Sequence, residues 1–564
     1  MRLASPTPIP LRCLLSGISV LAPFAISLLF ATPILAADVP TITSLVLLPA
    51  AEPATSPLPL PLPGVDLSHV PAPDPASLRD QLTPLLHQPV NPATMQRIRQ
   101  TILDHYKQAG HPFLDVGFPP QDVTDGTLMA VVTEYRVGAI KAAGNTWFSD
   151  RLILNSAGLT PGATIDKPEL DHRVSQLNEN AFLKVTPEFQ SGHAAGTTDV
   201  TLKAEDRFPV DFSLGYGNTG NPTTGWDRWN LGVAWGDALH LGQTFSYQLG
   251  TSSAFWHGLE HDMLRSEDPS FIGQNVSWSM PLPWGHTLLL TGGYSRQVPQ
   301  LGPDLGSVGI TDLLGMQYQI PLSETQQLAF GLDYKRSNNQ LSFGGITVQN
   351  GFTEVEEASV HYNLSLSHRY SQTLVDNALT LSPGGLSSYN TDNSFDPSGP
   401  GKSGTPGAHA RYAYDKLTVT EIVPLPHELG LVLRASGQES TGTLLGSEQM
   451  SIAGLDAVRG YQEFGIAGSR ALLLSAELRG PVFHAGLPND SLQPHIFVDE
   501  GEAWNPTASQ SAPAYVHSAS VGVGGRYQVD RYFSLRMEEG WQLIRSERQA
   551  ANGAFLHIGA TATW

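Results

Sequence analysis

The sequence predicts a transmembrane antiparallel β-barrel of about 16 strands, preceded by two small periplasmic α+β domains. From Pro209 onward, segments of about ten residues alternate apolar and polar side chains. Tight and long connections between these segments also alternate, as they do in outer-membrane barrels. Before Pro209, a helix-and-strand pattern occurs twice in succession.

The N-terminus has the features of a secretory signal peptide. Two arginines precede an apolar run from Leu14 to Leu35, and this run ends in the small-residue sequence PILAAD. We therefore expect residues 1–36 to be a signal peptide. Residues 37–56 include a proline-rich stretch, which cannot sustain a helix and is expected to be an N-terminal extension and linker.

The composition excludes several classes of protein. The only cysteine, Cys13, lies in the predicted leader, so we expect no disulfide and no cysteine metal site in the mature chain. The formal net charge of −20 argues against nucleic-acid binding, because that binding depends on neutralising phosphates. No mature segment has about 18 consecutive apolar residues, so a helical membrane protein is not expected.

Two modules are predicted before the barrel, at 57–135 and 136–207. In the first, Met95, Ile98 and Ile102 recur at helical spacing before two strands. The second repeats this order, with Ser149 as the expected N-cap of its first helix. Each pair of helices is expected to bury its apolar face on a three-stranded sheet, because neither element is stable alone.

The barrel is predicted to span residues 208–564. In TFSYQLG, apolar and polar side chains point to opposite faces, and the last segment, LHIGATATW, ends on the aromatic Trp564. The connections HLGQ, LPWG, LSET, RYSQ, LPHE and VDRY are tight. Because the even-numbered connections are the short ones, the modules and the C-terminus are expected on the periplasmic side. A soluble β-sandwich or propeller is the alternative.

Two segments in predicted external loops match, in full or in part, sequence motifs of catalytic or phosphate-binding sites. HGLEH, from His257 to His261, matches an inverted zinc-peptidase motif, but a loop rich in Asp, Ser and Pro does not supply the required helix. DPSGPGKSG imitates a phosphate-binding loop, with Asp396 where the first glycine should be. We find no convincing catalytic constellation, and we expect neither a cofactor nor a metal.

A long connection at about 440–468 contains the sequence GLDAVRGYQEFG. Two strands later, in HIFVDEGEAW, Phe497, Asp499 and Gly501 share one face. If the opposite face meets lipid, Asp499 points into the lumen and requires a partner. Arg459 is the candidate, because its guanidinium group matches a carboxylate in a bidentate pair. The alternative is an exposed loop with a solvated arginine.

These residues resemble a known family. Val458, Arg459, Gly460 and Tyr461 resemble the VRGY/F signature of the sixth loop in the BamA/TpsB superfamily, and Phe497–Gly501 resembles its F-x-D-x-G strand motif. The two repeated modules resemble POTRA domains. Two modules, and segments such as GNTWFSDRLILNSAGLTPG, are most similar to the TpsB two-partner secretion transporters of the ShlB/FhaC/HecB type.

The resemblance implies an outer-membrane transporter of a Gram-negative bacterium rather than an enzyme. Its POTRA domains would capture an unfolded secreted partner (a TpsA-like haemolysin or adhesin), which would cross the barrel to the cell surface without ATP. Further partners would be outer-membrane lipid and the barrel assembly machinery, through a C-terminal signal at Trp564. Polar lumen residues would keep the path wet: Glu477, Arg479, Arg536 and Glu538. An assembly factor of the same superfamily and a passive porin are the alternatives.

Overall fold

The structure is a computed structural model that describes residues 40–50, 63–252, 270–302, 304–395, 405–463, 465–508, 513–545 and 553–564. The predicted signal peptide lies outside the described residues, as do the HGLEH and DPSGPGKSG segments. The chain divides into two compact units, one of residues 1–102 and 116–132 and one of residues 103–115 and 133–564. A search of the described helices finds none with the length and apolar character needed to cross a bilayer.

The first α+β domain is built on a four-stranded sheet with the strand order β2-β1-β4-β3. Helix α2 buries Ile98 and Ile102, two of the residues predicted from helical spacing. The elements are β1 (Ser44–Pro49), β2 (Gly64–Asp66), α1 (Pro75–Leu82), the 3-10 helix η1 (Thr83–Leu85), α2 (Pro92–Gln108), β3 (Leu114–Gly117) and β4 (Thr127–Glu134).

Within the range 37–56 the structure describes residues 40–50, and these correct the predicted linker and the predicted start of the first domain at residue 57. Ser44–Pro49 is not a linker but strand β1, which pairs in parallel with both β2 and β4. Its side chains Leu45 and Leu47 are fully buried. A strand covered on both faces reads as a continuous apolar run without alternation, so the pattern used for the other strands does not detect it. This sheet has four strands rather than the expected three.

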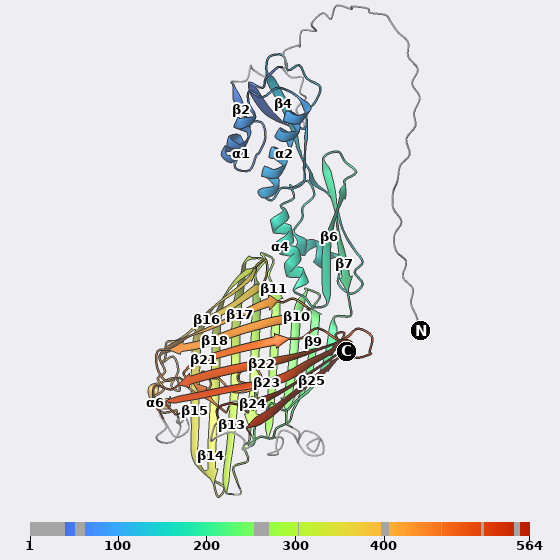
Figure 1. The fold of residues 1–564 in the computed structure, drawn as a ribbon. Helices are drawn as coiled ribbons and strands as arrows, with labels where there is room; N and C mark the ends of the chain where they lie inside the picture. Colours follow the sequence, from blue (N-terminus) through green and yellow to red (C-terminus); the bar gives the residue numbers. More distant parts are fainter. Residues whose placement is uncertain are drawn as a thin grey trace, which may run out of the picture. The chain divides into compact units, whose positions relative to one another are not determined.

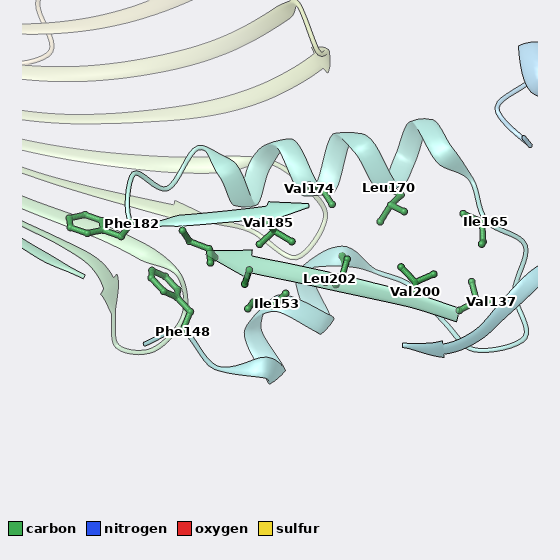
Figure 2. Close-up of a cluster of buried hydrophobic side chains, with 13 residues drawn as sticks. Val137, Phe148, Ile153, Ile165, Leu170, Val174, Phe182, Val185, Val200 and Leu202 are labelled. Carbon is green, nitrogen blue, oxygen red and sulfur yellow. The ribbon is translucent and has the colours of Figure 1, made fainter. Parts of the chain in front are cut away.

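The second domain forms the predicted three-stranded sheet, with the strand order β5-β7-β6. Its elements are β5 (Arg136–Ala143), α3 (Asp150–Ala157), α4 (Lys167–Asn178), β6 (Leu183–Ser191) and β7 (Thr197–Asp206). Ser149 caps α3 as predicted, because its hydroxyl accepts a hydrogen bond from Leu152 N at 3.2 Å. Both helices pack Ile153, Leu170 and neighbouring side chains against β7 (Figure 2).

From Val210 onward, all strands except two short ones form one closed antiparallel barrel (Figure 1). Its strands, sixteen in number, are β8 (Val210–Gly217), β9 (Arg228–Ala238), β10 (Gln243–Thr251), β11 (Phe271–Pro281), β12 (Thr287–Gln297), β13 (Leu305–Ser323), β14 (Gln326–Phe343), β15 (Ile346–Ser367), β16 (Gln372–Ser382), β17 (Tyr412–Pro424), β18 (Gly430–Ser440), β21 (Arg470–Arg479), β22 (Asp490–Trp504), β23 (Tyr515–Val529), β24 (Phe533–Gln542) and β25 (Ala554–Thr563).

The predicted alternation of faces is present on β22. Ile496 and Val498 are 55% and 47% exposed, whereas Phe497 and Asp499 are 5% and 1% exposed. Side chains on the outer face of a transmembrane barrel meet lipid, so Ile496 and Val498 face the bilayer. The six predicted tight connections join neighbouring strands. One external connection is also tight, because Gly344 and Gly345, both with positive φ, turn β14 directly into β15.

The barrel closes between its first and last strands. β25 pairs with β8 from Gly559–Gly217 to Thr563–Ser213. Beyond this ladder, Trp564 exchanges two backbone hydrogen bonds with Phe212, of 2.9 and 3.0 Å. The Trp564 side chain itself is 61% exposed. The C-terminal residue therefore contributes its backbone to closure and presents its indole at the barrel surface.

Candidate functional site

The sixth external connection, residues 441–469 between β18 and β21, folds into a compact segment that we call loop 6. It contains a small hairpin that the sequence did not indicate, in which β19 (Met450–Ser451) pairs with β20 (Ala467–Gly468). Together with nearby strand residues, loop 6 forms its own hydrophobic core, in which Ile452, Val458 and Tyr461 are fully buried. Loop 6 is thus a folded element, not an open surface loop.

Arg459 is the centre of the site, and the predicted contact with Asp499 is present. Arg459 Nε lies 2.7 Å from Asp499 Oδ2, and Arg459 Nη2 lies 2.9 Å from Asp499 Oδ1. The backbone N–H of Arg459 also donates to Asp499 Oδ2, at 3.1 Å. Only 5% of the arginine side chain and none of the aspartate side chain is exposed. The alternative of a solvated loop arginine is therefore wrong.

The structure adds partners that the sequence reasoning did not assign to Arg459. Its Nη1 atom donates to Glu477 Oε2 at 2.8 Å and to Glu538 Oε2 at 2.9 Å. The guanidinium carbon lies 3.5 Å from the centre of the Phe497 ring, which is cation–π geometry. One cation thus bridges three strands, because Glu477 is on β21, Asp499 on β22 and Glu538 on β24.

Three further arginines balance these carboxylates. Glu477 accepts from Arg479 Nε at 2.8 Å and from Arg526 Nη1 at 2.7 Å. Glu538 Oε1 accepts from Arg536 Nε at 2.5 Å. All four residues predicted to be polar and in the lumen do face the interior. However, Glu477 and Glu538 have only 7% and 0% side-chain exposure, so they belong to a buried network and do not line a wet path.

Glycines allow the backbone of loop 6 to approach the wall this closely. A Cβ atom on Gly460 would lie 2.7 Å from the carbonyl of Gly540 on β24, and Gly460 has a φ of +90°. A Cβ atom on Gly501 would lie 2.8 Å from Val458 Cγ2. Gly501 of the strand motif therefore makes room for loop 6, and Gly460 of the loop motif allows loop 6 to approach β24 closely.

Tyr461 fixes the end of the VRGY motif. Its ring is fully buried, and its hydroxyl donates to Ala519 O at 3.0 Å and also contacts Ile544 O. Next to it, Gln542 Nε2 donates to Gly460 O at 2.7 Å. The motif is therefore held at successive positions, by Asp499 on one side and by β23 and the end of β24 on the other.

A second charged cluster holds the beginning of loop 6 and was not predicted. Lys335 Nζ on β14 lies 2.7 Å from Glu357 Oε2 on β15 and 2.7 Å from Glu448 Oε2 in loop 6. Tyr412 donates to Glu357 at 2.7 Å, and Tyr414 donates to Glu448 at 3.1 Å. The alternation of their strands places Lys335 and Glu357 on the inner face, so the sequence could have indicated that both point into the barrel. It could not show that they pair with loop 6.

One group in this network has metal-ligand spacing. Ligand atoms of Glu477, His495 and Glu538 lie within 4.8 Å of one another. Both carboxylates already accept hydrogen bonds from Arg459, and each accepts from a further arginine. The site therefore suits the guanidinium cations that it holds better than it suits a metal ion.

Comparison with known proteins agrees with this architecture. A family model described as haemolysin secretion/activation protein ShlB/FhaC/HecB matches residues 196–525, and a model of the ShlB-type POTRA domain matches residues 60–134. The outer membrane transporter CdiB of Escherichia coli O6:K15:H31 (strain 536 / UPEC) is 24% identical over 413 residues, which are 71% of this chain and 66% of that protein. The heme/hemopexin transporter protein HuxB of Haemophilus influenzae (strain 86-028NP) is 21% identical, over 77% of this chain and 75% of HuxB.

Solved structures show the same fold. CdiB from Escherichia coli superimposes with a TM-score of 0.73 at 18% identity, covering 95% of this chain and 93% of that chain. CdiB from Acinetobacter baumannii gives a TM-score of 0.64 at 16% identity, covering 93% of this chain and 90% of that chain. The family model covers more than half of the chain. The chain therefore belongs to the ShlB/FhaC/HecB family of haemolysin secretion/activation proteins, outer-membrane β-barrels of Gram-negative bacteria with N-terminal POTRA domains.

Proposed function

We propose that this protein receives an unfolded secreted partner protein in the periplasm and moves it through the barrel to the cell surface. The observation that carries the proposal is the anchoring of loop 6 by Arg459 to three strands of the barrel wall. Burying so many charges is costly, and such networks are best explained where they specify one position of a segment. A passive porin should lack both the N-terminal POTRA domains and the paired loop and strand motifs that this chain has.

Capture of the partner is assigned to the edge strand β6 of the second POTRA domain. In the order β5-β7-β6, strand β6 pairs with β7 alone, so its other edge can accept an extended chain. Main-chain pairing of this kind tolerates many sequences, which suits the capture of a large unfolded client. Pro187, within β6, removes one donor but leaves the carbonyl acceptors.

The relatives support a proposal for the nature of the client. CdiB is named an outer membrane transporter and HuxB a heme/hemopexin transporter protein, and the family model refers to haemolysin secretion. We therefore propose a secreted client of the haemolysin or adhesin type. No ATP is expected outside the inner membrane, so folding of the client at the cell surface would drive export. Barrel assembly machinery would recognise the last strand through Trp564.

Gene deletion followed by analysis of the culture medium tests this function. We expect one large secreted protein to disappear and to return when the wild-type chain is supplied. Arg459→Ala should fail to restore it, although the barrel still shows the heat-modifiable migration of a folded β-barrel. Arg151→Ala is the control, because Arg151 is exposed on α3 and lies outside the loop 6 anchor. An unchanged medium together with a loss of other outer-membrane barrels would instead identify an assembly factor.

A further inference from the structure

Trp147, in the loop between β5 and α3, is held in an exposed position by a rigid turn. One carboxylate, that of Asp206, accepts hydrogen bonds from three successive backbone N–H groups, those of Thr146 (2.8 Å), Trp147 (2.6 Å) and Phe148 (2.8 Å). Phe148 turns inward and is buried, whereas 50% of Trp147 is exposed. Because the backbone is fixed, the exposure of this indole is built into the fold and does not reflect a loose loop.

The exposed indole packs against a second exposed aromatic side chain, Phe208. The ring centroids are 5.1 Å apart with an interplanar angle of 77°, and Phe208 is 53% exposed. Phe208 lies two residues before the first residue of β8, Val210, on the periplasmic side of the barrel. Further along β8, Phe212 is 46% exposed on the lipid-facing side of the strand. The aromatic pair therefore lies close to the edge of the barrel's lipid-facing surface.

Other exposed aromatic residues occupy the same end of the barrel. Trp284, Tyr370 and Tyr532 lie in periplasmic connections and are 60%, 68% and 48% exposed, and Trp564 directly follows the last strand. Trp and Tyr favour the headgroup level of a bilayer, and barrels carry girdles of them at both interfaces. The pair of Trp147 and Phe208 thus continues an aromatic girdle from the barrel onto the second POTRA domain.

We propose that Trp147 and Phe208 form a membrane contact that inserts into the headgroup region of the periplasmic phospholipid leaflet. The indole suits this position, since it has an apolar ring and an N–H group that can meet water or a lipid phosphate. The contact would fix the second POTRA domain against the bilayer beside the first barrel strand. This inference concerns the membrane position of the domain and does not depend on the export function.

Spin-label accessibility in the full-length protein tests the contact. Thr146 is exposed, so Thr146→Cys, in a chain carrying Cys13→Ser, places a nitroxide next to Trp147 without removing it. In phospholipid nanodiscs we expect the label to collide with lipid-soluble oxygen more than with a water-soluble nickel chelate. A second Trp147→Ser change should shift the balance toward the nickel chelate, whereas Trp147→Tyr should preserve it.

A label at Arg151, exposed on α3 of the same domain, is the water-exposed reference. Its spectrum must be unchanged by Trp147→Ser, which shows that the domain still folds. The proposal is overturned if the labels at 146 and 151 have the same accessibility in nanodiscs, or if Trp147→Ser has no effect at 146. Either result would leave the aromatic pair as a surface for a protein partner.

Discussion

Arg459→Ala is expected to release loop 6 from the wall, and the structure indicates which charge sets the cost. Without the guanidinium group, Glu477 keeps Arg479 and Arg526, and Glu538 keeps Arg536. Asp499, whose side chain has no exposure, keeps two hydrogen-bond partners among the described residues, Ser475 Oγ at 2.7 Å and the backbone N–H of residue 459. Asp499 is therefore the carboxylate left without a cation.

Removing one partner of a buried ion pair costs about 3–5 kcal/mol, because the remaining charge stays buried. We expect Arg459→Ala to lower the free energy of unfolding by about this amount. Adding Asp499→Asn removes the unpaired charge, so the double variant should be more stable than Arg459→Ala alone. This non-additivity distinguishes a buried ion pair from a simple loss of packing around Phe497.

Guanidinium unfolding of the reconstituted protein, followed by tryptophan fluorescence, measures these differences. Arg434→Ala, at an exposed barrel arginine on β18, is the matched control and should remain close to wild type. The reasoning is refuted if Arg459→Ala stays within about 0.5 kcal/mol of wild type, the usual range of a neutral surface change. It is also refuted if the added Asp499→Asn change destabilises the protein further.

Two further changes test other contacts of loop 6. Lys335→Met leaves Glu357 and Glu448 buried without a cation, with 1% and 2% side-chain exposure, so we expect the free energy of unfolding to fall by about 3–5 kcal/mol and a protease to cleave loop 6 faster. Adding Glu357→Gln and Glu448→Gln should reverse both effects in part. Unchanged cleavage would show that this cluster does not hold the loop. Gly460→Ala places a methyl group 2.7 Å from the Gly540 carbonyl and should destabilise by about 1–3 kcal/mol in the same unfolding assay. Gly225→Ala has a similar φ of +80° but no atom within 4 Å of the new Cβ, so an equal effect would mean that backbone strain, not the close approach, is responsible.

The predictions from sequence that hold are those that depend on local periodicity. The alternation of apolar and polar residues in β22 correctly predicted that Asp499 points inward and Val498 outward. The helical spacing of Ile98 and Ile102 correctly predicted helix α2. The pairing of Arg459 with Asp499 could be predicted because alternation directs Asp499 inward, where a carboxylate needs a cation, and the guanidinium group of Arg459 matches a carboxylate.

The features that were missed depend on contacts between distant parts of the chain. Strand β1 pairs in parallel with β4, as Leu45 with Leu128, and its uniform apolar run gives no alternation. The Lys335 contact with Glu448 spans 113 residues and depends on the path of loop 6 inside the barrel. Glu477 and Glu538 were placed in the lumen correctly, but the sequence could not show that one arginine reaches both.

Disulfide formation between loop 6 and the wall tests the central claim most directly. The Cβ of a residue replacing Gly501 would lie 2.8 Å from Val458 Cγ2, so Val458→Cys and Gly501→Cys bring two thiols within bonding range. We predict that this pair crosslinks spontaneously in outer membranes, whereas Val458→Cys with Val498→Cys, on the lipid-facing side of β22, does not. Absence of the first crosslink, or equal crosslinking of both pairs, would contradict an anchored loop 6.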